Sequence, residues 1–145
     1  MIGRDRKRAP RWFRLAAWVL VLWGAMGVSA CISQLRHGAE AMGAASDYDR
    51  VLFASLPLWY RADYAIATGT MLAGALALLV RSRHAVALLT VSLVAVLIQF
   101  GWMFAMTDIL AVKGPYTLYF PLLIMAIGAL ALQLAHVARR RGWID

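Results

Sequence analysis

Acidic residues and cysteine are both scarce in this chain. Seven of its 145 residues are acidic, fifteen are lysine or arginine, and Cys31 is the sole cysteine. A lone cysteine excludes an internal disulfide and a cysteine-based metal site. The three histidines never stand four residues apart, so no helical histidine pair for zinc or haem is indicated. We therefore expect no metal and no cofactor.

Catalytic and nucleotide-binding motifs are also missing from the sequence. It contains no phosphate-cradling Gly-rich loop, no HExxH and no GxSxG. Nothing resembles an activated nucleophile or an acid–base pair at a defined spacing. The sequence therefore argues against an enzyme.

Hydrophobic residues are abundant and gathered into long runs. They make up 63% of the chain, whereas soluble domains are about 45–50% apolar. Runs of ~20 apolar residues are long enough to cross a bilayer. The sequence predicts an all-α, polytopic membrane protein with a single four-helix domain over residues 1–145, in contact with the lipid bilayer. The expected spans are residues 15–35, 57–80, 85–106 and 116–138.

Positive charge is distributed unevenly around these runs. Eleven lysines and arginines, among them Arg4, Arg6 and Lys7, lie in the N-terminal segment, the turn at residues 81–84 and the C-terminal tail, and four lie on the other side. Such a bias places the basic segments in the cytoplasm. We expect a bacterial inner-membrane protein with both termini inside. Because the charge is split among short flanking segments, it does not indicate nucleic-acid binding.

The N-terminal region also resembles a secretory signal. Residues 28–31, Val-Ser-Ala-Cys, resemble a lipoprotein cleavage box. The apolar run is nevertheless long enough to span and is followed by three more. We therefore expect it to be the first transmembrane helix.

The first outer loop, residues 36–56, contains a helix signal. Ser46 followed by Asp49 is typical of a capped helix start. Tyr48, Val51 and Ser55 then recur at helical spacing. The pattern predicts a short amphipathic helix at the outer interface, or alternatively the first turns before the second span.

Polar side chains are predicted to gather at the outer ends of the second and third spans. Ionisable groups inside spans are costly and therefore suggest function. One hypothesis is a shallow site for a small polar ligand. The alternative is an Arg61–Asp63 pair that sets helix register, with Asp108 capping a short helix. The candidate residues are Tyr60, Arg61, Asp63, Tyr64, Gln99 and Asp108.

Small residues recur along the second span. Ala65, Gly69, Ala73 and Ala77 stand four residues apart, with Thr70 and Gly74 beside them. Small residues on one face let helices approach closely in lipid. We predict this as the main helix-packing face.

Several short motifs are similar to those of a known family. They are Leu22-Trp23-Gly24, Pro57 with Trp59, Tyr64-Ala65-Ile66-Ala67, Arg81-Ser82-Arg83, Thr107-Asp108, Ala111-Val112, Gly114-Pro115, Pro121 and Arg141-Gly142-Trp143. Over nearly its whole length the chain resembles uncharacterised bacterial four-span membrane proteins that are often labelled sugar transporters. The resemblance implies the same four-span topology and carries no catalytic residues.

Two functions compete on the sequence alone. One is a non-enzymatic accessory subunit or small oligomer that associates with another membrane protein or with itself. The alternative is a dimeric transporter of a small, sugar-like solute, because four helices rarely enclose such a path alone. No acid lies deep in the first, third or fourth run, which argues against a proton-coupled exporter.

Overall fold

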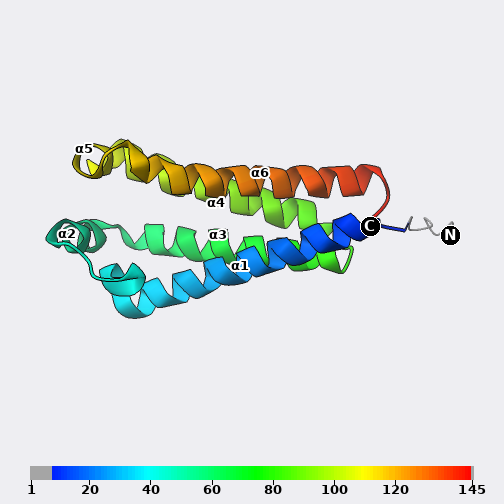
Figure 1. The fold of residues 1–145 in the computed structure, drawn as a ribbon, viewed down its shortest axis with the longest axis horizontal. Coiled ribbons are helices and arrows are strands. Elements are labelled where there is room, and N and C mark those ends of the chain that lie inside the picture. Colours follow the sequence, from blue (N-terminus) through cyan, green and yellow to red (C-terminus); the bar gives the residue numbers. More distant parts are fainter. Residues whose placement is uncertain (1–7, 145) are drawn as a thin grey trace.

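The computed structural model describes residues 8–144, and every regular element in that range is helical. Arg4, Arg6 and Lys7, which count toward the predicted topology, lie outside the described residues. Four long helices run side by side, with shorter ones at one end (Figure 1). In chain order the elements are α1 (Arg11–His37), η1 (Gly38–Met42), α2 (Asp47–Ser55), α3 (Leu58–Leu79), α4 (His84–Met106), α5 (Ile109–Lys113), η2 (Pro115–Leu118) and α6 (Tyr119–Arg140).

Helices α1, α3, α4 and α6 are long and apolar enough to cross a membrane. Many large apolar side chains point outward from them, among them Leu15, Leu22 and Leu130, each more than 60% exposed. An apolar exterior of this kind suits lipid rather than water. The all-α fold and its four long apolar helices are therefore confirmed.

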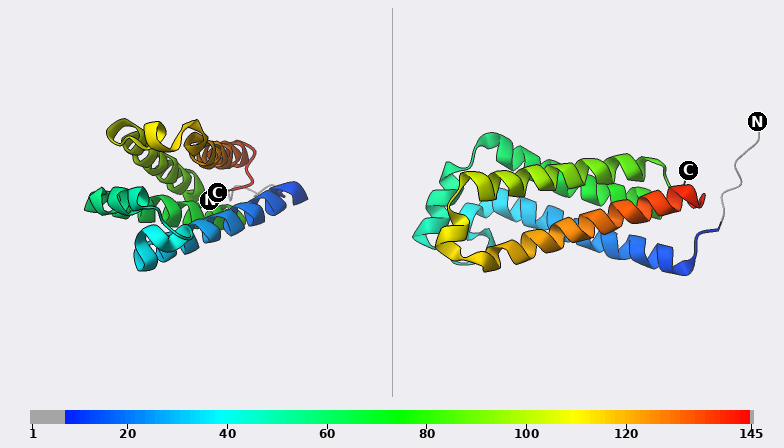
Figure 2. Two further views of the ribbon diagram at one scale, coloured as in Figure 1. Left: turned by 60° about the vertical axis from the view of Figure 1, so that its left-hand side comes forward. Right: turned by 90° about the horizontal axis from the view of Figure 1, so that it is seen from above.

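The two ends of the bundle differ. The described N- and C-terminal residues lie at one end with the α3–α4 turn, and we name this the terminal end (Figure 1). The other end, named the loop end, carries η1, α2, α5 and η2 (Figure 2).

Local sequence signals explain where several helices begin and end. Ser46 and Asp49 form a complete capping box at the start of α2. Pro121 lies in the first turn of α6, where a missing N–H is tolerated. At the α3–α4 turn, Arg81 adopts a left-handed φ of 61°, and the Ser82 amide donates to the Ala77 carbonyl at 2.7 Å. That bond satisfies one of the last carbonyls of α3.

Close helix contacts depend on two glycines. Helices α3 and α4 pack as a central antiparallel pair, with α1 against α3 and α6 against α4. A Cβ atom on Gly24 of α1 would lie 2.8 Å from the Leu72 Cα of α3. A Cβ atom on Gly74 of α3 would lie 2.7 Å from the Leu89 side chain of α4. Both positions therefore require glycine at the present helix spacing.

The buried core is concentrated at the terminal end. Phe13, Leu78 and Leu89 are its largest fully buried side chains. Trp143, beyond α6, packs on Trp12 and Phe13, with ring centroids 5.4 Å apart in each pair. The Arg81 Nε donates to the Trp143 carbonyl at 2.6 Å. The C-terminal segment thus ties α6 to α1 and to the α3–α4 turn.

Toward the loop end the bundle opens. Helix α1 diverges from α6, and the two helices form opposite sides of the molecule there (Figures 1 and 2). The central α3–α4 pair lies between them. This divergence produces the groove described below.

The small-residue face predicted on α3 is divided between two surroundings. Ala65 and Gly69 are exposed, Ala73 and Thr70 are partly buried, and Gly74 and Ala77 are buried inside the chain. Residues four apart are separated by about 400° around the helix axis, so each member of the row is rotated by ~40° from the previous one. Over the twelve residues from Ala65 to Ala77 the row turns by ~120°. The part of the row nearer the loop end, Ala65 and Gly69, therefore faces outward. The part nearer the terminal end, Gly74 and Ala77, packs on α4.

Replacing Gly24 with alanine is expected to destabilise the protein. The added Cβ would meet backbone atoms of Leu72, so α1 and α3 would have to separate. Overpacking of this kind costs about 1–3 kcal/mol. The melting temperature in detergent should fall for Gly24→Ala. Gly101→Ala is the control because nothing lies within 4 Å of that position, and equal melting temperatures for the two variants would contradict this packing.

Candidate functional site

A groove of about 470 Å³ runs along the described part of the chain. Its walls come from all four long helices and from η1. Pockets that bind small ligands are commonly about 300–1,000 Å³. The groove is therefore large enough to bind part of an organic molecule. Trp23, Met26 and Gly27 of α1, Met71 of α3, Phe100 of α4, and Phe120 and Ile124 of α6 form most of its apolar lining.

Polar groups line part of this groove. Gln34, Tyr64, Thr68, Ser92 and Gln99 come from α1, α3 and α4. The Ser92 hydroxyl donates to the Ala67 carbonyl at 2.7 Å, and the Thr68 hydroxyl donates to the Tyr64 carbonyl at 2.9 Å. These two hydroxyls mainly serve helix packing. The two glutamines and the tyrosine are the groups better suited to recognise a ligand.

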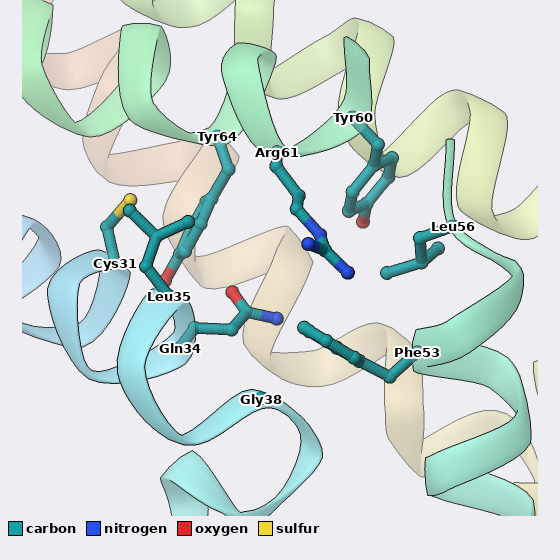
Figure 3. Close-up of a pocket in the computed structure, with 9 residues that line it drawn as sticks. All are labelled: Cys31, Gln34, Leu35, Gly38, Phe53, Leu56, Tyr60, Arg61 and Tyr64. Carbon is teal, nitrogen blue, oxygen red and sulfur yellow. The ribbon is translucent and has the colours of Figure 1, made fainter. Parts of the chain in front are cut away.

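A second, smaller pocket of about 60 Å³ adjoins the groove at the loop end. Gln34, Gly38 and Tyr64 line both cavities, so the two adjoin at these three residues. Figure 3 shows the Arg61 side chain extending from α3 into the small pocket, beside Gln34. The Arg61 guanidinium carbon lies 4.8 Å from the centroid of the Phe53 ring, at cation–π distance.

The predicted polar cluster assembles only in part. Tyr64 and Gln99 line the groove, and Arg61, Tyr60 and Tyr64 line the small pocket. The Tyr60 ring packs on Trp102 and Trp59, with centroids 5.4 and 6.0 Å away. Three aromatic rings on α3 and α4 thus form one packed group beside the pocket.

The two acids of that cluster lie elsewhere. Asp63 lines neither cavity, and its buried Oδ2 has no hydrogen-bond partner among residues 8–144. No Arg61–Asp63 ion pair exists, so the predicted register pair is wrong. Asp108 occupies the N-cap position of α5, but its side chain makes no capping hydrogen bond. The predicted short helix from Ile109 is confirmed, with Asp108 at its N-cap position, but the predicted side-chain cap is wrong.

Asp108 instead helps to join the two loop-end helices. Its carboxylate accepts a hydrogen bond from the Tyr48 hydroxyl at 2.7 Å. Nearby, Lys113 at the end of α5 forms an ion pair with Asp49 of α2. Partial burial and the Asp108 contact raise the pKa of Tyr48 to about 12. The Lys113 contact and the helix cap lower the pKa of Asp49 to about 2.

Several site residues escaped prediction. Phe53, Gln34 and Lys113 come from segments far apart in the chain, and no local pattern connects them. On α1, Gly24, Gly27 and Ala30 stand three residues apart, and this row of small residues was a usable signal for close helix packing. The structure shows such packing at Gly24, and all three residues also line the groove. Within the described range, no three His, Cys, Asp or Glu side chains lie close enough to hold a metal ion.

Comparison with known proteins identifies no relative. No protein-family model, curated protein or solved structure matches this chain.

Acid should weaken the contact between α2 and α5. The Asp49 pKa is lowered from 3.8 to about 2 in the folded protein, so this carboxylate stabilises the fold above pH 4. That contribution should be lost as the pH falls from about 4 to about 2. The melting temperature of Asp49→Asn should therefore lie below that of the wild type at pH 5 and approach it near pH 2.

Asp47→Asn is the matched control. Asp47 lies in the same helix turn and contacts Arg50 at 3.4 Å, but its side chain is fully exposed, where an ion pair contributes little. Its melting temperature should follow that of the wild type at both pH values. A gap between Asp49→Asn and the wild type that persists unchanged at pH 2 would contradict the ion-pair explanation.

Proposed function

We propose that the chain is a non-enzymatic, multi-pass protein of the bacterial inner membrane that works by association, as an accessory subunit or small oligomer. The observation that carries this proposal is the outward face of α3. Gly69 is exposed there, and nothing lies within 4 Å of the position that its Cβ would take. Ala65, one turn away, is exposed as well.

An open, small-residue face of this kind suits a second helix. In lipid there is little hydrophobic drive for helices to associate, so close backbone approach supplies much of the attraction. Leu58 and Leu76, at the two ends of α3, are 82% and 44% exposed and would border such a contact. Ala65 and Gly69 thus lie between these two leucines along α3.

The charge distribution supports a cytoplasmic terminal end. The described basic residues at that end are Arg8, Arg11, Arg14, Arg81, Arg83, Arg139, Arg140 and Arg141. The loop end carries the acids Glu40, Asp47, Asp49 and Asp108. Basic segments stay on the cytoplasmic side during insertion.

Reporter fusions test this orientation. A fluorescent protein that matures in the cytoplasm but not after export, fused at the C-terminus, should fluoresce. The same reporter inserted between residues 43 and 44, in the η1–α2 connection, should stay dark. The reverse pattern would overturn the proposed topology.

Gly69→Leu should release the associated protein. A leucine side chain would fill the space into which a partner helix packs. The measurement is mild detergent extraction of the tagged protein followed by native mass spectrometry. Gly101→Leu is the control, since Gly101 of α4 is equally open in the isolated chain. A partner that stays bound to Gly69→Leu would exclude this face.

Transport by a dimer stays as the alternative, and the groove is the observation that favours it. Tyr64 and Gln99 of the predicted cluster line it. The groove lies between diverging helices of one chain, so a closed path would need a second copy. A homodimer in the same mass spectrum, with no other protein present, would favour this alternative.

A further inference from the structure

We propose that the groove binds one anionic phospholipid, with its headgroup phosphate at Arg61 and one acyl chain between α1 and α6. This inference rests on the membrane placement proposed above, but not on the partner at α3. Three features of the molecule support it: the charge at the loop end, the length of the groove and its volume.

Arg61 supplies the charge. It is exposed, and no acidic side chain lies within ion-pair distance of it among the described residues. The nine residues that line the small pocket include this arginine and no acid. Gln34 and Tyr64 add hydrogen-bonding groups to the same pocket (Figure 3). A guanidinium with such neighbours matches a phosphate group.

Arg61 also lies at the depth of a lipid headgroup. It is the fourth residue of α3, so it stands about 5 Å along the axis from the start of the helix. On the cytoplasmic side, basic pockets between transmembrane helices are known sites for anionic headgroups, and the same charge pairing would act at the loop end. A pocket of about 60 Å³ has room for a group of several atoms, since one water needs about 10–15 Å³.

The groove fits one acyl chain in length. It follows α1 from Gln34, beside Arg61, to Trp23. Those eleven residues correspond to ~17 Å of helix. One leaflet of a bilayer contributes about half of its ~30 Å hydrocarbon core, or ~15 Å. The apolar part of the groove therefore extends through about one leaflet, away from the charged pocket.

The length of the groove also favours a lipid chain over a helix. A spanning helix is ~30 Å long, whereas the groove follows α1 for ~17 Å. Its volume of about 470 Å³ lies in the range of pockets that hold small molecules. A second copy or a partner helix would therefore extend well beyond the groove.

Lipid selection by the purified protein tests the proposal. The wild type is incorporated into vesicles of equal phosphatidylglycerol and phosphatidylcholine with the same chains, extracted gently and examined by native mass spectrometry. One phosphatidylglycerol should stay bound per chain. Arg61→Gln should lower retention of phosphatidylglycerol by about tenfold, the ratio expected for one lost charge-assisted hydrogen bond. It should also reduce the preference over phosphatidylcholine, because the choline group of that lipid already offsets the phosphate charge.

Two controls make the result specific. Arg36→Gln removes the same charge from the exposed end of α1, where Arg36 lines neither cavity, and should retain phosphatidylglycerol. Gly27→Leu should reduce retention of both lipids by filling the groove, because a Cβ there meets Thr68 only at 3.4 Å and the backbone stays in place. Circular dichroism and gel filtration confirm that each variant is folded.

Three outcomes would overturn the proposal. They are equal retention of the two lipids by the wild type, an equal loss in Arg36→Gln and Arg61→Gln, and a second protein helix that displaces the lipid from the groove. Gly69→Leu separates the two proposals, because Gly69 lies outside the groove. That variant should lose its protein partner and keep its lipid.

Discussion

Close packing at the terminal end holds the four long helices together, and the rest of the structure depends on it. Trp143 fills the space beside Phe13, and small residues such as Gly24 and Gly74 let neighbouring backbones approach. In lipid, dispersion contacts of this kind supply much of the attraction between helices. A well-packed core at one end allows the helices to separate at the other.

That separation creates the features with functional potential. With the bundle held at the terminal end, α1 and α6 diverge and leave a groove along the central pair. Arg61 lines the small pocket that adjoins this groove, so one cationic group lies close to an apolar channel. The outward face of α3 around Gly69 is a separate surface. One small domain thus offers two independent places for association.

The loop end is held differently. There, α2 and α5 are joined by polar contacts, Tyr48 with Asp108 and Asp49 with Lys113. Exposed polar contacts are individually weak and respond to pH and salt. The groove therefore opens toward the end of the molecule whose contacts respond more to pH and salt.

The sequence by itself determined the properties that depend on composition and near neighbours. Hydrophobic runs specified four long helices, and Ser46 with Asp49 specified the start of α2, because backbone hydrogen bonds and caps involve residues only a few positions apart. Only the tertiary structure decided which polar groups meet. Asp108 pairs with Tyr48, sixty residues away, and Arg61 lies beside Phe53 of α2, because the rotation and packing of separate helices set those contacts. Arg61 and Asp63 do not pair, because residues two apart project from opposite sides of a helix. The same rotation turned Gly74 inward and left Gly69 open.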